Sequence, residues 1–426
     1  MELKEKIAKK DINVAVIGLG YVGLPLAMAI IDKGVKVIGI DLDKRKIDSL
    51  VKGQNYIQDV DDRALAAAVK EGMLEPTADF KDMAKADVVC ITVPTPINKE
   101  KTPDLTYVES ASKSVAANLK KGQLIILKST TYPGTTDEVV LPILEETGLK
   151  AGTDFYLAFA PERIDPGNEK FGTANTPKVV GGINEDSTHL AGDFFRIFIN
   201  QVHEVSSTKA AEMSKILENT FRLINISFIN EMALIAGGMG IDIWEVIEAA
   251  KTKPFGFMPF YPGPGLGGHC IPVDPYYLSY KAKEYNLLTR FIDVSSEIDD
   301  YMQQHVVGLI KKAAEKDKPR VLVLGAAYKK DIDDFRESPS IKVMELLEKE
   351  GIGFDYYDPF VPKVVEGHFE KEGLGEINKN VIGSYDVVAI LTDHSEMDYG
   401  MVLDAAKKVV DTRNAIKGKS DKVLKI

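Results

Sequence analysis

Short apolar runs separated by helix-length segments occur in the first half of the chain and again in its last quarter. Apolar runs of this length, followed by glycine or a turn, are typical of buried parallel strands. Alternation of such strands with helices predicts a doubly wound α/β unit at each end of the chain. The expected strands are 13–17, 35–41, 87–93, 124–127 and 155–159 in the first unit, and 320–325, 354–357, 387–391 and 409–411 in the second.

The middle of the chain lacks strand patterns. Apolar residues recur at helical spacing from Thr208 to Met239 and predict one long helix, and helical character persists to about residue 315 around an interrupting glycine-proline loop. The predicted fold is therefore α/β: an N-terminal Rossmann-type doubly wound domain (1–206), a central all-helical domain with a long helix (207–315), and a C-terminal Rossmann-like α/β domain (316–426). Apolar side chains on the long helix exceed what one core face needs.

A glycine fingerprint, Gly18-Leu19-Gly20-Tyr21-Val22-Gly23, follows the first expected strand and opens a helix. Its glycines permit a tight turn, close approach of a pyrophosphate and close packing of helix on strand. Asp41 ends the next strand, where a carboxylate accepts hydrogen bonds from an adenosine ribose and repels a 2′-phosphate. NAD is therefore favoured over NADP, although Lys44, Arg45 and Lys46 weaken that exclusion. The alternatives are FAD or another dinucleotide, and glycines that only tighten the turn.

The last α/β unit begins differently. Its first strand ends in Gly325-Ala326-Ala327-Tyr328-Lys329, with no second GxGxxG fingerprint. A different nucleotide-like ligand is therefore expected there.

One cysteine stands in a loop that is too rich in glycine to be built for packing. The segment 262–275 carries four glycines around Cys270, and Pro272 and Pro275 exclude a helix through the cysteine itself. Cys270 is therefore a candidate nucleophile, which needs activation because a free thiol near a pKa of ~8.5 is mostly protonated at neutral pH. Asp274 is either a helix N-cap or part of this site. Cys90, inside an apolar strand, is expected in the core.

Two residues of the long helix share one face, because Lys215 and Asn219 are four positions apart. Beside a thiol they would hold a developing oxyanion and position a water, whereas elsewhere each would be an ordinary solvated residue. His269, next to Cys270, invites comparison with a protease-type base, but adjacent residues in an extended loop point apart. The histidines have no metal-like spacing, so no metal is expected.

The charge composition of the chain limits the kinds of binding partner that it can have. With 53 basic and 64 acidic side chains, the 426-residue chain has a net charge of −11, which argues against affinity for nucleic acid or anionic membranes. An anionic substrate would need a local basic pocket. Two cysteines and an N-terminus without an apolar segment favour a reducing cytoplasm, and the lack of an 18-residue apolar run predicts no membrane span.

Seven motifs in order closely resemble the UDP-glucose/UDP-mannose dehydrogenase family, nearly from end to end. The form of the cysteine loop is most similar to the UDP-N-acetylglucosamine 6-dehydrogenase branch. The motifs are the fingerprint at 18–23, Val93-Pro94-Thr95-Pro96, Lys128-Ser129-Thr130, Ala160-Pro161-Glu162-Arg163, Lys215-x3-Asn219-Thr220, Gly267-Gly268-His269-Cys270, and Lys329-Lys330-Asp331-x2-Asp334-x-Arg336-Glu337-Ser338-Pro339.

The resemblance implies a four-electron oxidation of the sugar C6 alcohol to a carboxylate, with two NAD in succession and one water. It implies that Cys270 forms a thiohemiacetal and then a thioester, which water hydrolyses. It also implies a homodimer through the long helix, and a uronic acid product for surface polysaccharide or glycan synthesis.

Roles for individual residues follow from the same resemblance. Lys215 and Asn219 would stabilise charge at C6, Asp274 would assist the lysine or the thiol, and Glu162 with Thr130 would orient the hydrolytic water. The implied cofactor contacts are Gly18, Gly20, Tyr21, Val22, Gly23, Asp41, Lys46, Thr95, Thr130, Glu162 and Arg336. The implied substrate contacts are Glu162, Arg163, Lys215, Asn219, Arg222, Phe260, Tyr261, Gly265, Gly267, Lys329 and Arg413.

Other functions stay open at this stage. The same chemistry on UDP-N-acetylmannosamine or UDP-glucose differs only in the sugar pocket, where an acetamido group needs room and a polar partner. Arg222 and Asn225 are candidates for that pocket, and a solvated or interface role suits them equally. A silent nucleotide-sugar sensor would not need the thiol, and a cysteine hydrolase would leave the NAD fingerprint unexplained.

Overall fold

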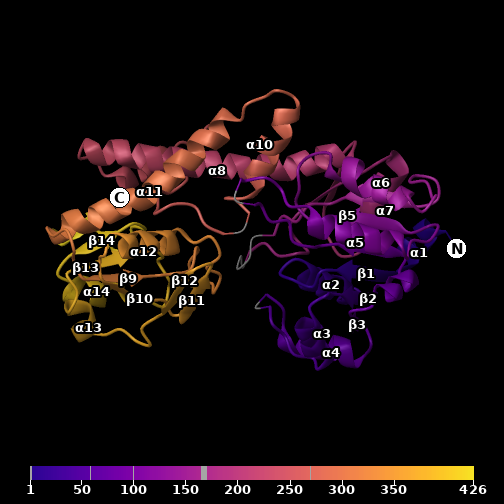
Figure 1. Cartoon of the computed structure of the whole chain (residues 1–426), viewed down its shortest axis with the longest axis horizontal. Coiled ribbons are helices and arrows are strands. Elements are labelled where there is room, and N and C mark those ends of the chain that lie inside the picture. Colours follow the sequence, from indigo (N-terminus) through magenta and orange to yellow (C-terminus); the bar gives the residue numbers. More distant parts are fainter. Residues whose placement is uncertain (1, 58, 99, 165–169, 269) are drawn as a thin grey trace. The chain divides into compact units, whose positions relative to one another are not determined.

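A computed structural model describes residues 2–57, 59–98, 100–164, 170–268 and 270–426. The chain forms two compact units (Figure 1). The first unit comprises Met1–Glu218 and Tyr276–Leu287, and the second comprises Asn219–Pro275 and Leu288–Ile426. His269, singled out from the sequence, lies outside the described residues.

The first unit is built on a sheet with the strand order β3-β2-β1-β4-β5-β6-β7-β8. Neighbouring strands are parallel except β6 and β7, which are antiparallel. The order 3-2-1-4-5 is that of a Rossmann sheet. Its strands are β1 (Asn13–Ile17), β2 (Lys36–Ile40), β3 (Leu74–Thr77), β4 (Val88–Ile91), β5 (Leu124–Leu127), β6 (Tyr156–Phe159), β7 (Lys178–Gly182) and β8 (Val202–Glu204).

Alternate residues of the central strands enter different cores. Val14 and Val16 of β1 belong to one apolar cluster, whereas Ala15 and Ile17 belong to another, as the two-residue period of a strand requires. Both faces of the sheet are therefore covered. The remaining elements of this part are α1 (Leu3–Lys9), α2 (Gly23–Ile31), α3 (Lys44–Val51), α4 (Asp62–Lys70), η1 (Phe80–Lys85), α5 (Thr106–Ala116), η2 (Thr136–Val140), α6 (Leu141–Glu145) and α7 (Glu185–Arg196).

The middle of the chain is helical. It contains α8 (Thr208–Gly238), α9 (Ile243–Lys251), α10 (Asp274–Glu284) and α11 (Arg290–Ala314), and no strand occurs among its described residues. A non-helical stretch between α9 and α10 carries the glycine-proline loop, so the interruption of the helices is longer than the loop itself. The helix α8 contributes residues to both compact units.

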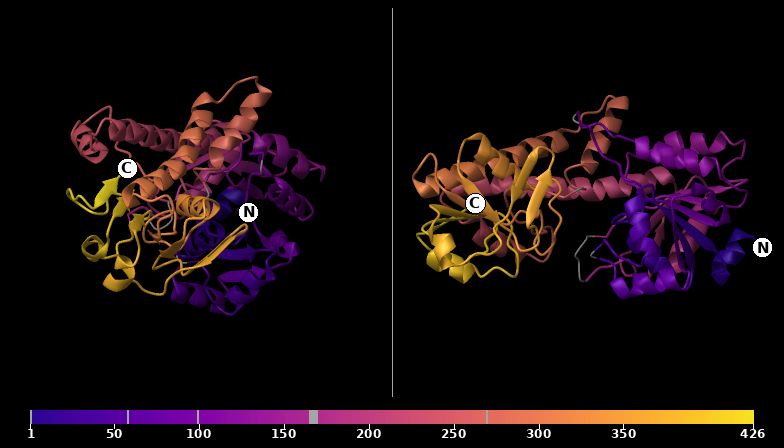
Figure 2. Two further views of the ribbon diagram at one scale, coloured as in Figure 1. Left: turned by 60° about the vertical axis from the view of Figure 1, so that its left-hand side comes forward. Right: turned by 60° about the horizontal axis from the view of Figure 1, so that its bottom comes forward.

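The second unit contains a parallel sheet with the order β10-β9-β13-β14-β15 and a separate antiparallel hairpin, β11–β12 (Figure 2). Its elements are β9 (Val321–Leu324), α12 (Pro339–Lys349), β10 (Phe354–Tyr357), β11 (Lys363–Glu366), β12 (Phe369–Glu372), α13 (Lys379–Gly383), β13 (Val387–Ile390), α14 (Tyr399–Ala405), β14 (Val409–Asp411) and β15 (Val423–Lys425).

The predicted fold class is confirmed: two parallel-sheet regions flank a helical middle. The sequence pattern missed β7, a fully buried strand, because it begins with Lys178 and ends with two glycines. Strands β3, β8, β11, β12 and β15 were also missed, since each is short and only partly buried. The domain boundaries at 206 and 315 stay predictions.

No helix of the described residues is long and apolar enough to cross a membrane.

Candidate active site

The glycine fingerprint forms an open cradle in the first unit. Gly18 follows β1 with φ +90°, and a Cβ there would lie 2.7 Å from the backbone oxygen of Thr92. A Cβ at Gly23, the first residue of α2, would overlap the carbonyl of Gly18, whereas a Cβ at Gly20 would meet nothing within 4 Å. Gly18 and Gly23 are therefore needed for packing, and Gly20 leaves space for a ligand at the N-terminus of α2.

Asp41 ties the fingerprint to the next strand. Its Oδ2 accepts a hydrogen bond from the backbone N–H of Leu19 at 2.8 Å and forms an ion pair with Lys46 Nζ at 3.1 Å. Its Oδ1 accepts a hydrogen bond from the backbone N–H of Asp43 at 2.9 Å. A carboxylate at the end of β2, beside a glycine turn and a helix N-terminus, is the set of groups that fits NAD. Tyr21 is exposed in this turn.

Thr95 and Thr130 follow the adjacent strands β4 and β5, at the carboxyl edge of the sheet where α/β folds bind ligands. Thr95 is buried, and its carbonyl accepts a hydrogen bond from the hydroxyl of Tyr277. Thr130 is half-buried, and the preceding Ser129 donates from Oγ to the carbonyl of Val93 at 2.7 Å. Both threonines therefore stand on anchored segments.

Glu162 lies between two buried lysines. Lys128 Nζ is 3.2 Å from Glu162 Oε2, and Lys178 Nζ is 3.1 and 3.2 Å from Oε1 and Oε2. Burial alone would raise the pKa of the Glu162 carboxyl, but the two lysines outweigh it and hold that pKa far below its usual range. Burial lowers the pKa of Lys178 to about 7, although Glu162 opposes the shift.

Arg163, predicted to contact the substrate, is held within the first unit. Its Nη2 pairs with Glu218 Oε1 at 2.7 Å, and its Nη1 donates to the carbonyl of Pro177 at 2.7 Å. Arg163 therefore ties the segment after β6 to α8 and to the residues that lead into β7.

A buried glutamate of α8 holds the segment that follows Thr130. Glu212 Oε2 accepts from the N–H of Gly134 at 2.5 Å, and Oε1 accepts from the N–H and Oγ1 of Thr136 at 2.9 and 2.7 Å. Burial raises the pKa of Glu212 to about 7, against these hydrogen bonds. Glu212 is one helical turn before Lys215, so one helix both anchors this segment and carries a predicted catalytic lysine.

In the second unit, Cys270 is exposed on the turn that leads into α10. Its carbonyl accepts from the N–H of Asp274 at 2.8 Å. Asp274, the first residue of α10, is buried and accepts at Oδ2 from Nδ2 of Asn219 at 2.5 Å. The structure thus brings Asn219, Asp274 and the cysteine turn together, and Lys215 belongs to the part of α8 in the first unit.

Contacts from three directions fix the glycine loop before Cys270. The carboxylate of Asp299, on α11, accepts from the N–H of Leu266, and Asn230 Oδ1, on α8, accepts from the N–H of Gly263 at 3.0 Å. Gly265 has φ +139°, and a Cβ there would collide with the amide nitrogen of Gln303. Further along, a Cβ on Gly267 would lie 2.5 Å from the Cβ of Tyr328, and a Cβ on Gly268 would lie 2.8 Å from its ring. These glycines allow the loop to pack directly on its supports.

A cavity of about 530 Å³ in the second unit contains two predicted substrate residues, Tyr261 and Arg413. The ring of Tyr261 is stacked with Trp244, with 6.0 Å between centroids and 14° between planes. Arg413 donates from Nε to the carbonyl of Leu391 at 2.8 Å. The remaining lining residues are Glu248, Pro262, Asp393, Asn414 and Lys417.

The other predicted residues of the second unit lie around these elements. The ring of Phe260 packs against Phe221 of α8 at 5.9 Å between centroids, and Arg222 is exposed on the same helix. Lys329 is half-buried after β9. Arg336, predicted to border the cofactor, belongs to the second unit and forms a bidentate pair with Asp334 at 2.9 and 2.7 Å.

Asp358 shows why the second sheet has no NAD cradle. Like Asp41, it follows the second strand of its sheet, and it accepts from the N–H groups of Ala326 and Ala327 at 2.7 and 3.0 Å. It is also bound to Nε2 of His394 at 2.9 Å, and both side chains are fully buried. The Asp358 carboxylate is therefore fully buried against a histidine, whereas the side chain of Asp41 is 10% exposed.

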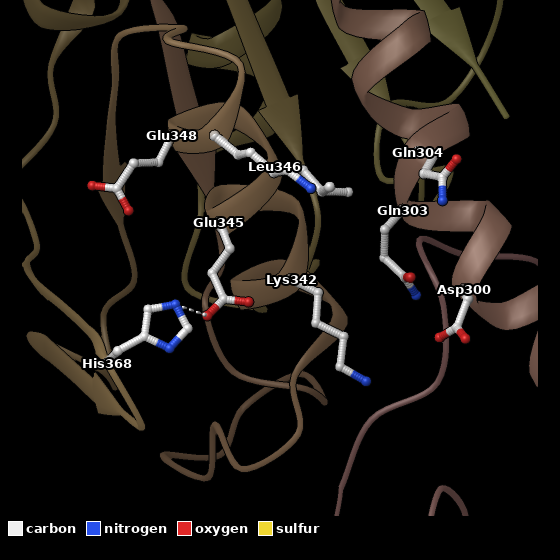
Figure 3. Close-up of a pocket in the computed structure, with 9 residues that line it drawn as sticks. Asp300, Gln303, Gln304, Lys342, Glu345, Leu346, Glu348 and His368 are labelled. Carbon is white, nitrogen blue, oxygen red and sulfur yellow. Dashed lines mark ion pairs between the residues drawn. The ribbon is translucent and has the colours of Figure 1, made fainter. Parts of the chain in front are cut away.

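A second cavity, of about 480 Å³, lies between α11, α12 and the β11–β12 hairpin (Figure 3). Its charged side chains have both signs, and His368 Nε2 is 3.6 Å from Glu345 Oε1. It contains none of the predicted site residues. Its lining residues are Asp300, Gln303, Gln304, Lys342, Glu345, Leu346, Glu348, Lys349 and His368.

Sequence patterns missed several of these groups. Lys178, Glu212 and Asp299 act on residues 16, 76–78 and 33 positions away in the chain. Trp244 is the only tryptophan in the sequence, and that rarity could have indicated its place in the cavity beside Tyr261. Among the described residues, no cluster of three His, Cys, Asp or Glu side chains is suited to a metal ion.

Three family models match successive parts of the chain. They describe the NAD binding domain (residues 12–199), the central domain (209–301) and the UDP binding domain (322–418) of the UDP-glucose/GDP-mannose dehydrogenase family.

Individual relatives match nearly the whole chain. A UDP-N-acetyl-D-glucosamine 6-dehydrogenase of Pseudomonas aeruginosa is 39% identical, with 91% of this chain and 92% of the relative covered. A UDP-N-acetyl-D-mannosamine dehydrogenase of Pyrococcus horikoshii is 35% identical, with 95% and 96% covered. A solved structure of a UDP-D-ManNAc dehydrogenase from Pyrococcus horikoshii superposes with a TM-score of 0.88 at 34% identity, covering 97% of this chain and 98% of that one.

Proposed function

Because this chain belongs to the UDP-glucose/GDP-mannose dehydrogenase family and is an NAD-dependent UDP-sugar dehydrogenase, we propose that it oxidises the C6 alcohol of UDP-N-acetylglucosamine to the carboxylate. The similarity to the Pseudomonas aeruginosa enzyme supports this choice of sugar. UDP-N-acetylmannosamine is the alternative that the Pyrococcus horikoshii relative favours, and UDP-glucose is a third. The family assignment supports an enzyme over a silent nucleotide-sugar sensor or a cysteine hydrolase, and turnover that requires NAD would remove both alternatives.

The proposed reaction removes four electrons in two steps. NAD supplies a hydride acceptor for each step, so two NAD are consumed in succession. Between the steps, the Cys270 thiolate adds to the C6 aldehyde as a thiohemiacetal, and the second hydride transfer leaves a thioester that water hydrolyses. The observation that carries this proposal is the exposed Cys270 on a glycine loop, one turn before α10 and beside the Asn219–Asp274 pair. A helix N-terminus attracts negative charge and so favours a reactive thiolate.

Other residues predicted from the sequence assist the oxidation and the hydrolysis at C6. Lys215 and Asn219 stabilise oxygen charge at C6, and Asp274 fixes the amide of Asn219 through its hydrogen bond. Glu162 and Thr130 orient the water that hydrolyses the thioester. Each of these roles rests on family resemblance together with the placement described above.

For the substrate, the cavity with Tyr261 and Arg413 offers an aromatic surface and a guanidinium, which suit a nucleotide with a diphosphate. Lys417 adds a second cation to the same cavity, and Lys329 adds a further cation after β9. Phe260, Gly265 and Gly267 contribute the loop backbone.

We further propose that the protein is a homodimer through α8. The exposed residues Phe221, Phe228 and Ile235 recur seven positions apart and form an apolar stripe along this helix. Such a stripe is suited to a second copy of the same helix, because a two-fold interface is self-complementary.

The test is NADH formation with the three UDP-sugars in parallel, for the native chain, Cys270→Ala and Cys90→Ala. Two NADH per UDP-N-acetylglucosamine are expected, lost in Cys270→Ala and retained in Cys90→Ala, because Cys90 is a buried core residue. Preference for another sugar would correct the substrate and keep the mechanism. Two NADH from Cys270→Ala at the native rate would contradict the covalent mechanism.

A further inference from the structure

The cluster of Lys128, Glu162 and Lys178 carries one more positive charge than negative charge in a buried setting. Lys128 and Lys178 are 1% and 3% exposed. Their ammonium groups lie 5.4 and 5.9 Å from the ring centroid of Phe195, with Cys90 also close to both charges. An excess buried charge is costly, so one lysine is under pressure to lose its proton.

The hydrogen bonds make Glu162 a poor base by itself. Glu162 Oε1 accepts from the N–H groups of Arg163 and Ile164 at 2.8 and 3.1 Å in addition to Lys178, and Oε2 accepts from both lysines. A carboxylate has about four lone-pair positions, and these donors fill them. With both lysines charged, no position is left for a water.

Lys178 is the group whose deprotonation opens such a position. Its ammonium has three N–H donors and three acceptors within reach, which are Oε1 and Oε2 of Glu162 and the carbonyl of Pro161 at 3.2 Å. The neutral amine keeps only two donors and gains a lone pair. Loss of one proton from Lys178 therefore releases one contact to Glu162 and lets that carboxylate accept a hydrogen bond from water.

We propose that Lys178 is the proton acceptor of the hydrolytic step and that Glu162 passes to it the proton of the attacking water. As the water oxygen bonds to C6 of the thioester, its O–H bond breaks and the proton moves to Glu162. A proton then moves from Glu162 to the Lys178 amine, while the C6–S bond breaks and the Cys270 thiolate leaves. This inference rests on the proposed function, and it makes Lys178 a positioning residue that acts through Glu162.

The pH dependence follows from the charges that act on Lys178, which are those of Glu162 and Lys128. The pKa of Lys178 is lowered to about 7, because burial and the positive charge of Lys128 lower it more than Glu162 raises it. Hydrolysis is therefore slow where Lys178 is protonated and rises through about pH 7. Removal of the Lys128 charge, as in Lys128→Met, raises the pKa of Lys178 and moves this rise to higher pH.

The experiment is stopped-flow NADH formation with saturating NAD and the UDP-sugar that the native chain oxidises, for the native chain, Lys178→Gln, Lys178→Arg and Lys128→Met. Arginine keeps the charge and the donors but does not give up its proton in proteins, so it separates proton acceptance from charge. Both Lys178 variants are expected to release a burst of two NADH per subunit and then turn over about 10²-fold more slowly. The acyl adduct on Cys270 should accumulate and be visible by intact mass spectrometry.

Several results would overturn the inference. Hydrolysis at the native rate in Lys178→Arg would show that charge alone suffices. Loss of the burst amplitude in folded Lys178 variants would show that Lys178 only supports the nucleotide site. An unchanged pH profile in Lys128→Met would contradict the titration even if the Lys178 variants fail to fold. Absence of NADH from the native chain with every UDP-sugar would instead count against the proposed function.

Discussion

Asn219 donates a hydrogen bond to Asp274 across a buried contact between α8 and the first residue of α10, with 2.5 Å between Nδ2 and Oδ2. The two residues are 55 positions apart in the chain, and they are 9% and 3% exposed. The contact fixes the amide of Asn219 beside the turn of Cys270. Asn219 donates and Asp274 accepts, so an exchange of the two residues can separate a structural role of the pair from a chemical one.

A swap of these two residues tests that separation. Asn219→Asp should lower stability by about 1–3 kcal/mol, because it places a second buried acceptor against Asp274 and removes the donor. The double variant Asn219→Asp with Asp274→Asn restores a hydrogen bond of reversed polarity and should recover most of the lost Tm. Its kcat should remain low if the Asn219 amide and the Asp274 charge serve the chemistry. Recovery of both Tm and kcat would assign the pair a purely structural role.

Gly20→Ala should weaken NAD binding without destabilising the fold. A Cβ at Gly20 meets nothing within 4 Å, so the added methyl group affects only the space left for the cofactor. The KM for NAD should rise at least tenfold while Tm stays within about 2 °C, since a surface substitution usually changes stability by no more than about 0.5 kcal/mol.

Gly18→Ala is the matched comparison for Gly20→Ala. Its φ is +90°, and a Cβ would press on the backbone of Thr92, so it should lower Tm as well. An unchanged KM for NAD in Gly20→Ala would place the cofactor elsewhere.

Asp299 should make the stability of the chain depend on pH. Burial raises the pKa of Asp299 to about 6, although the N–H of Leu266 and the charge of Lys342 oppose the shift. The folded chain therefore holds this proton where the unfolded chain has released it. The stabilising contribution is complete below about pH 4 and is lost as pH rises through about 6.

Asp299→Asn should remove this dependence, since an amide oxygen can still accept from Leu266. The stability of Asp299→Asn relative to the native chain should improve by up to about 3 kcal/mol between pH 4 and pH 8, followed as the difference in Tm. Asp300→Asn, the exposed neighbour on α11, should show only a small trend, because the Asp300 charge is a minor cause of the raised pKa of Asp299. A parallel trend in both variants would refute the assignment to Asp299.

Phe228→Glu on α8 should dissociate the proposed dimer. The side chain is 51% exposed in the single chain, so a charge there costs the fold little but opposes burial against a second copy. Light scattering should report the mass of one chain for this variant and of two for the native protein. Glu71→Gln, at an exposed position just after α4 in the first unit, should leave the dimer intact. A native protein that elutes as a monomer would exclude this interface.

The sequence by itself determined the α/β fold class, the NAD fingerprint and the glycine-rich loop around Cys270, because each depends on residues that are close together in the chain. Gly18 to Gly23 form one turn, and Asp41 ends the next strand. Cys270 stands within fourteen residues whose glycines and prolines limit the backbone to a loop. Local spacing was therefore enough to predict these features, and the family matches confirm the NAD-dependent class.

Only the tertiary structure decided which buried charged residues contact the predicted site segments. Lys178 reaches Glu162 because β7 follows β6 in the sheet, Glu212 reaches Gly134 because α8 packs there, and Asp299 reaches Leu266 from α11. These contacts join residues 16, 78 and 33 positions apart. A buried charge and a surface charge look alike in a sequence, and burial, which sets the pKa values of these groups, exists only after the elements have packed.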